Sequence, residues 1–207
     1  MNAKISLAGV FGLLVLATAT EAKADLLTVS AQIDGGGAYG KGIGGDQKNT
    51  AFYQTAPRGV YGVKVNAEVL FIDAWIAHHQ FTNGSRLATW SEIGVGMDTE
   101  LPLGGNKKGL GGYLLLGVGA TFGVGTGQQV QLPLDNGELS DKGFALVAKI
   151  GGGSHVTKLI DLGVEFPVTA GYYFKSGAGA AANNLSTHYQ AVSAQALVFL
   201  RFRFGAK

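Results

Sequence analysis

The stretch from Leu159 to Lys175, LIDLGVEFPVTAGYYFK, alternates strictly between two kinds of residue. Every even position from Ile160 to Phe174 is apolar, whereas the odd positions carry mostly acidic, small or hydroxyl residues. Only a β-strand places alternate residues on opposite faces, so the pattern predicts a strand. The apolar face exceeds what an ordinary strand of about five or six residues needs, and it suits a tilted crossing of a bilayer by roughly nine to eleven residues. The aromatic residues at 172–174 are typical of an interfacial girdle.

Residues 1–24 have the features of a cleaved signal peptide. Lys4 gives a positive start, residues 5–19 form an apolar segment, and Ala22-Lys23-Ala24 matches the cleavage pattern. The alternative, an anchoring helix, is disfavoured because the apolar run is shorter than the about 20 residues of a span. We therefore expect export and a single mature domain at 25–207, without a transmembrane helix.

The composition of the mature part excludes several classes. Without Lys4, Glu21 and Lys23 it holds 14 basic and 13 acidic residues, and it forms no basic stripe of the kind that binds nucleic acid. The chain contains no cysteine, so disulfides do not hold it together. Its 34 glycines are scattered, which excludes collagen-like and linker sequences.

Alternation and turn chemistry together predict eight strands. The expected ranges are 27–36, 60–69, 72–81, 88–101, 113–124, 143–153, 159–175 and 189–204. Long connections at 37–59, 125–142 and 176–188, with a shorter one at 82–87, alternate with turns near 70, at 102–112 and at 154–158. This rhythm is typical of an all-β, eight-stranded antiparallel transmembrane (outer-membrane) up-and-down β-barrel, with long outer loops and both termini on the periplasmic side.

A soluble sandwich or a lipocalin-like barrel also has alternating strands. Two features favour the membrane barrel. The faces opposite the apolar ones are crowded with glycine, as at Gly94, Gly119 and Gly163, which suits a narrow interior. The export signal and the aromatic ending LRFRF also fit a barrel in lipid.

The less apolar faces would then line the lumen. The interior of a barrel of about eight strands is just wide enough for side chains to fill it, and charges enclosed there must pair. We therefore predict a structural, salt-bridged lumen network in which Asp161 and Glu165 pair with the next strand's arginines. A path for protons or small ions is the alternative. The network comprises Asp34, Lys64, Glu68, Asp73, Glu92, Asp98, Glu100, Lys149, Asp161, Glu165, Arg201 and Arg203.

No catalytic or metal-binding set emerges. Ser154 and His155 are adjacent, so a strand sends them to opposite faces, and no acid is evident beside Ser186 and His188. The pair His78-His79 diverges in the same way, and we expect all four histidines at interfaces or in loops. Segment 135–138 with Asp141 could bind calcium, although DNG is more often a turn. We predict no enzyme, cofactor or metal.

Two glycines and one proline carry further predictions. The segment GVGTGQ at 123–128 lacks the lysine and helix of a phosphate loop, so we expect Gly125 and Gly127 to mark a bend where a strand leaves the membrane. Pro167 removes a ladder hydrogen bond in a barrel that has no free edge. We expect a bulge or a missing bond there.

Three segments carry a resemblance to a known family: GVYGVKVNAEVLFIDAWIAHHQF (59–81), FGVGTGQQVQLPLDNGELSDKGF (122–144) and PVTAGYYFKSGAGAAANNLSTHYQ (167–190). They resemble myxobacterial outer-membrane barrels of adventurous gliding motility, the Glt components. The resemblance implies a non-enzymatic barrel in a multi-protein envelope complex, with sibling barrels and a periplasmic or lipoprotein partner. It carries over no catalytic residue. The sequence departs from the general barrel pattern where Gly205-Ala206-Lys207 follow the last aromatic residue.

The functional expectation is a structural or interaction barrel in the bacterial outer membrane, surrounded by outer-membrane lipids. Its long connecting segments 37–58, 125–142 and 176–188 would present surfaces at the cell exterior. The alternative is a small channel or transporter for ions or small hydrophobic solutes.

Overall fold

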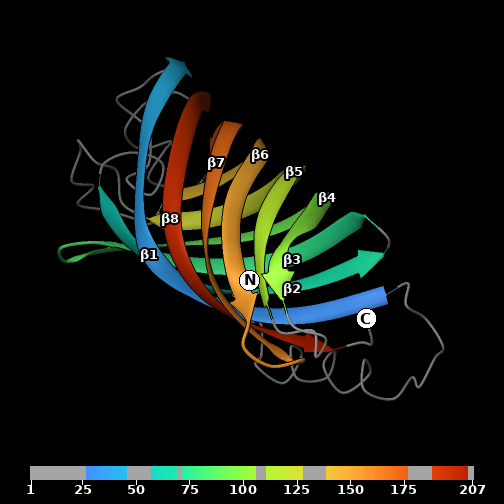
Figure 1. Cartoon of the computed structure of the whole chain (residues 1–207). Coiled ribbons are helices and arrows are strands. Elements are labelled where there is room, and N and C mark those ends of the chain that lie inside the picture. Colours follow the sequence, from blue (N-terminus) through green and yellow to red (C-terminus); the bar gives the residue numbers. More distant parts are fainter. Residues whose placement is uncertain are drawn as a thin grey trace.

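The structure is a computed structural model that describes residues 27–45, 57–69, 71–105, 111–127, 139–176 and 188–204. Eight strands make up nearly all of these residues (Figure 1). Their bounds are β1 Leu27–Gly45, β2 Arg58–Val69, β3 Ile72–Asn83, β4 Arg86–Gly105, β5 Gly111–Gly127, β6 Leu139–His155, β7 Ile160–Ser176 and β8 His188–Phe204. No helix in the described ranges is long and apolar enough to cross a membrane.

The strands form one closed ring in chain order. Each strand pairs antiparallel with its sequence neighbours, and β1 pairs with β8, beside which it lies in Figure 1. Closure removes the unpaired strand edges that lipid does not tolerate. The predicted all-β, eight-stranded antiparallel barrel is confirmed.

Two ends of the barrel can be told apart by their connections. At one end, here called the turn end, short connections join β2 to β3, β4 to β5 and β6 to β7, and the first and last strands begin and finish. At the other, the loop end, longer intervals separate β1 from β2, β5 from β6 and β7 from β8, whereas β3 and β4 are joined by Gly84 and Ser85 alone. Gly84 has a φ of 62°, which favours glycine in so tight a turn.

The strands are strongly staggered around the ring. Residues that are paired directly across neighbouring strands form a row around the barrel. The row that starts at Ala31 on β1 passes through Val65 and the remaining strands to Gln190, and it returns to β1 at Gly44. That is thirteen residues further along, one of which belongs to the bulge between Gly42 and Gly44. The row therefore climbs toward the loop end by about one and a half residues per strand, as tilted barrel strands require.

Several strands are longer than the sequence analysis expected. β1 continues through the glycine-rich segment to Gly45, because its backbone stays paired with β8 as far as Tyr189. β4 runs to Gly105, β5 to Gly127, and β6 starts at Leu139. Glycine and polar residues predict the end of each of these strands, but in a closed barrel the neighbouring strand keeps such residues extended.

The two faces of the barrel wall have opposite character. Large apolar side chains point outward and are exposed: Ile33 is 51% exposed and Leu146 is 69% exposed. Charged and polar side chains such as Asp161, Lys64 and Arg203 point inward and are buried. A soluble barrel would have the reverse arrangement, whereas lipid favours an apolar exterior around a polar interior.

Glycines make room for the two tryptophans in the lumen. A Cβ at Gly94 or Gly119 would collide with the indole of Trp75, and one at Gly123 or Gly125 with that of Trp90. The expected bend at Gly125 is wrong, since β5 continues past this position and ends at Gly127. Gly125 is small because Trp90 lies against it.

The ladder is interrupted at Pro167, and the predicted missing pairing is confirmed. The β7–β8 pairs run from Ile160 to Glu165 and resume at Val168, so Phe166 and Pro167 are skipped. The register is the same on both sides of the gap, which means that no bulge is present. On the other side Pro167 still lies opposite Lys149 of β6.

Candidate functional site: the charged lumen

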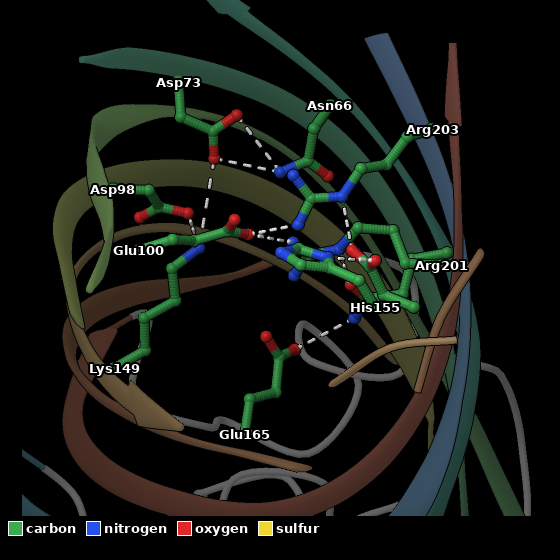
Figure 2. A network of polar contacts seen from close by, with 11 residues as sticks. Asn66, Asp73, Asp98, Glu100, Lys149, His155, Glu165, Arg201 and Arg203 are labelled. Atoms are coloured by element: carbon green, nitrogen blue, oxygen red, sulfur yellow. Dashed lines mark hydrogen bonds and ion pairs between the residues drawn. The ribbon is translucent and has the colours of Figure 1, made fainter. Parts of the chain in front are cut away.

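The turn end of the lumen holds a chain of ion pairs (Figure 2). Glu100 on β4 accepts hydrogen bonds from Arg201 at 3.0 Å and from Arg203 at 2.5 Å, both on β8. Arg203 also donates through Nε to Asp161 on β7, and Nδ1 of His155 lies 2.6 Å from the other oxygen of Asp161. The chain crosses the lumen from β4 to β8, so it ties opposite walls together.

A second group lies next to it, toward the middle of the lumen. Lys149 on β6 forms an ion pair with Asp98 on β4, and its ammonium group lies 3.9 Å from Asp73 on β3. Asn66 donates to both oxygens of Asp73, at 2.9 and 3.1 Å. Lys149 thus stands between two carboxylates and lowers their mutual repulsion.

Gln32 on β1 connects the first of these groups with β7. Its amide nitrogen donates to Glu165 at 3.1 Å, and its amide oxygen accepts from Arg201 at 3.2 Å. The expected pairing of β7 acids with β8 arginines therefore holds in part. Asp161 bonds to Arg203, but Glu165 is held by Gln32, because Arg201 turns across the lumen to Glu100.

The loop-end half of the lumen is more aromatic. The indoles of Trp75 and Trp90 each donate to one oxygen of Glu92 at 3.0 Å. Asp34 lies 3.3 Å from His79. These contacts place two further members of the predicted set, Asp34 and Glu92, inside the lumen.

Asp141 also points into the lumen, and the segment 135–138 lies outside the described residues. It accepts a hydrogen bond from Tyr189 at 2.6 Å and lies 3.8 Å from Lys175. The calcium-loop alternative loses its Asp141 ligand to this contact, because the side chain is 1% exposed.

The structure thus places all members of the predicted set on the inward face, although they do not form one cluster. Glu68 lines the cavity at the turn end, and Lys64 lines another beside Glu165. Sequence reasoning missed Gln32, Tyr189 and Lys175, which are polar residues on the same parity as the chosen ones. The alternation of inward and outward positions along the strands is enough to identify them as lumen residues.

The histidines lie in different surroundings. His79 is buried beside Asp34, so its placement at an interface or in a loop is wrong. His155 ends β6 and stacks on Tyr113 with ring centroids 4.8 Å apart. His78 bonds to Ser91 at 2.7 Å, but both side chains lie on the outward face, on the other side of the sheet from the lumen carboxylates. These residues therefore do not form a hydrogen-bonded catalytic triad of serine, histidine and acid. Ser186 lies outside the described ranges.

Among the described residues the lumen holds at least two cavities. One of about 80 Å³ is lined by Lys64, Glu92 and Glu165, and one of about 280 Å³ at the turn end is lined by Glu68, Glu100 and both arginines. Asp98 lines both, so its ion pair with Lys149 stands between them. Side chains fill the space between the cavities, which suits a plugged lumen better than an open pore.

Comparison with known proteins decides the class. No family model matches the chain, and no curated protein matches it. Among solved structures, Neisserial surface protein A (NspA) is similar with a TM-score of 0.51 and 12% identity, over 85% of this chain and 96% of that one. The fold is that of an outer-membrane β-barrel.

Two further solved structures are similar at lower scores. The outer membrane protein OprG from Pseudomonas aeruginosa has a TM-score of 0.43 and 11% identity, over 89% of this chain and 98% of that one. Ail, the attachment invasion locus protein of Yersinia pestis, has a TM-score of 0.34 and 11% identity, over 87% of this chain and the whole of that one. At these identities the likeness to NspA concerns the fold of the outer-membrane barrel alone. The function of the present protein has to be argued from its lumen and its outer wall.

Proposed function

We propose that this outer-membrane barrel is a non-enzymatic structural or interaction component of the cell envelope, with a lumen closed by its own side chains. The observation that carries the proposal is the crossing of the lumen by Glu100, Arg201 and Arg203, next to the pair of Lys149 and Asp98. Buried ion pairs of this kind hold opposite walls at a fixed distance, and removal of one partner is costly.

Conductance of the purified barrel in a planar bilayer tests the closed lumen. We expect no steady open level in a preparation whose folding is verified by heat-modifiable migration on a gel. A stable open channel would overturn the closed lumen and favour the alternative function, a small outer-membrane channel or transporter for ions or small hydrophobic solutes.

The interaction role is assigned to the long connections at the loop end, which would face the cell exterior once the signal at 1–24 has directed export. Sibling barrels and a periplasmic or lipoprotein partner are the proposed contacts. The resemblance to Glt components points to the gliding-motility machinery, and this finer assignment rests on that sequence resemblance alone.

Deletion of residues 128–138, between β5 and β6, tests the role of one connection. An Asn-Gly turn takes the place of the deleted residues, because Gly127 and Leu139 are paired across β5 and β6 and only a hairpin turn between them keeps both strands intact. We expect pull-down from detergent-solubilised membranes to lose at least one partner that the full chain retains. An unchanged set of partners would count against an interaction role for this segment.

A further inference from the structure

The apolar belt on the outer wall is uneven around the barrel. On β7 eight successive outward positions are apolar: Ile160, Leu162, Val164, Phe166, Val168, Ala170, Tyr172 and Phe174. On β3 the outward positions change after three apolar residues, from Ile72, Ala74 and Ile76 to His78, Gln80 and Thr82. The wall is therefore polar on β3 where it is still apolar on β7.

The register allows depths on the two strands to be compared. His78 is paired through Ser91, Val124 and Lys142 to Phe174, four strands further on. Because the row climbs about one and a half residues per strand, Phe174 lies about six residues nearer the loop end than His78. At roughly 3.3 Å per residue and a tilt of about 45°, the difference is roughly 14 Å. Val168, six residues before Phe174, thus lies at the depth of His78.

The polar side chains on this side form three hydrogen-bonded pairs, which we call the outward polar patch. Tyr61 donates to Gln80 at 2.6 Å, and His78 lies 2.7 Å from Ser91. Thr89 and Thr126 are joined at 3.1 Å. The patch covers β2, β3 and β4 with the edge of β5, and each pair bridges neighbouring strands.

On β2 and β3, the stripe of apolar residues between the patch and the turn end is too short for an ordinary bilayer. A strand that crosses the hydrocarbon needs roughly nine to eleven residues, of which about five point outward. β3 offers three such residues and β2 offers four: Val63, Val65, Ala67 and Val69. Hydrocarbon of normal thickness would therefore extend over the outward polar patch.

We propose that lipid headgroups of the leaflet at the loop end move inward over the outward polar patch, so that the barrel thins the bilayer on its β2–β3 side. A hydrophobic stretch shorter than the bilayer is commonly accommodated by local thinning. Tyrosine, in addition, is enriched at the level of the headgroups.

A second copy of the chain is the competing occupant of this surface. Protein interfaces inside membranes use polar side chains to bond across the interface. Here the six polar side chains bond to one another within one chain, and the tyrosine and glutamine pair does so at 2.6 Å. The headgroup layer needs no such bond from the patch, which favours lipid.

Single-cysteine spin labels test the proposal, since the chain has no cysteine of its own. His78→Cys and Val168→Cys place labels at one depth on opposite walls, and Gln80→Cys with Ala170→Cys form a second matched pair. In dimyristoylphosphatidylcholine vesicles we expect the ratio of nickel-chelate to oxygen accessibility to be several-fold higher at 78 and 80 than at 168 and 170. Folding of each variant is checked by heat-modifiable migration.

Two results would overturn the proposal. Equal ratios within both matched pairs would mean that the bilayer has one thickness around the barrel. Labels at 78 and 80 that are shielded from both reagents, and become accessible when the vesicles are diluted with lipid, would assign the patch to a second copy of the chain.

Discussion

The indole ring of Trp90 on β4 lies directly over the backbone of Gly123 on β5. A Cβ added at Gly123 would meet Cζ2, Cε2 and Nε1 of that indole. The ring is held in place because Nε1 donates to Glu92 at 3.0 Å, and it packs edge-on against Tyr173 with centroids 5.7 Å apart. The narrow lumen therefore accepts a large side chain on one strand where the next strand has none.

Gly123→Val should destabilise the barrel by about 1–3 kcal/mol, the usual cost of overpacking a filled interior. Unfolding by urea in lipid vesicles, followed by heat-modifiable migration, measures the loss. Gly35→Ala is the matched control, because a Cβ at that position meets its nearest neighbours at 3.7 and 3.8 Å. Equal losses in the two variants would show that crowding by Trp90 is not the cause.

Arg203→Met should destabilise the barrel by about 3–5 kcal/mol, because it leaves the buried Asp161 and the half-buried Glu100 without a shared cation. Lys142→Ala removes an exposed outward cation and should stay within about 0.5 kcal/mol of the unchanged barrel.

A double variant checks this explanation. Arg203→Met combined with Asp161→Asn should cost less than the sum of the two single losses, since contacting partners are not additive. Strict additivity in urea unfolding would contradict the direct coupling of Arg203 and Asp161.

Brominated lipids should quench the intrinsic fluorescence only weakly. The chain has two tryptophans, and both indoles point into the lumen with 7% exposure. Tyr172→Trp adds an outward indole and serves as the positive control, in which strong quenching is expected. Strong quenching of the unchanged protein would mean that Trp75 or Trp90 faces lipid.

The sequence predicted the faces of the wall well, because alternation on a strand depends on local geometry alone. Residues such as Ile160 and Asp161 were assigned to opposite sides without knowledge of any neighbour. The extent of β1 was underestimated, since Gly37–Gly45 carries little side-chain pattern and its strand geometry comes from pairing with β8. Glycine indicates a turn in isolation and permits close packing inside a barrel.

The contacts across the lumen could not be predicted in the same way. Glu100 and Arg203 are 103 residues apart, and whether they meet depends on the stagger of all eight strands. Alternation along the strands predicts that Glu165 pairs with an arginine of the adjacent strand, whereas the stagger brings Gln32 to it from β1. Side-chain parity thus identified the members of the lumen network, while their partners required the closed ring.

Pro167→Val should stabilise the barrel by about 0.5–1.5 kcal/mol, the net value of one additional hydrogen bond. The pairs of Phe166 and Pro167 with β8 are missing, and the register on either side of the gap already fits a continuous ladder. A residue with an N–H at this position can therefore restore the bond without moving either strand. Urea unfolding gives the change in free energy, and amide hydrogen exchange should show a new slowly exchanging proton at 167. Loss of stability, or fast exchange at 167, would indicate that the gap between β7 and β8 has a cause other than the missing N–H of proline.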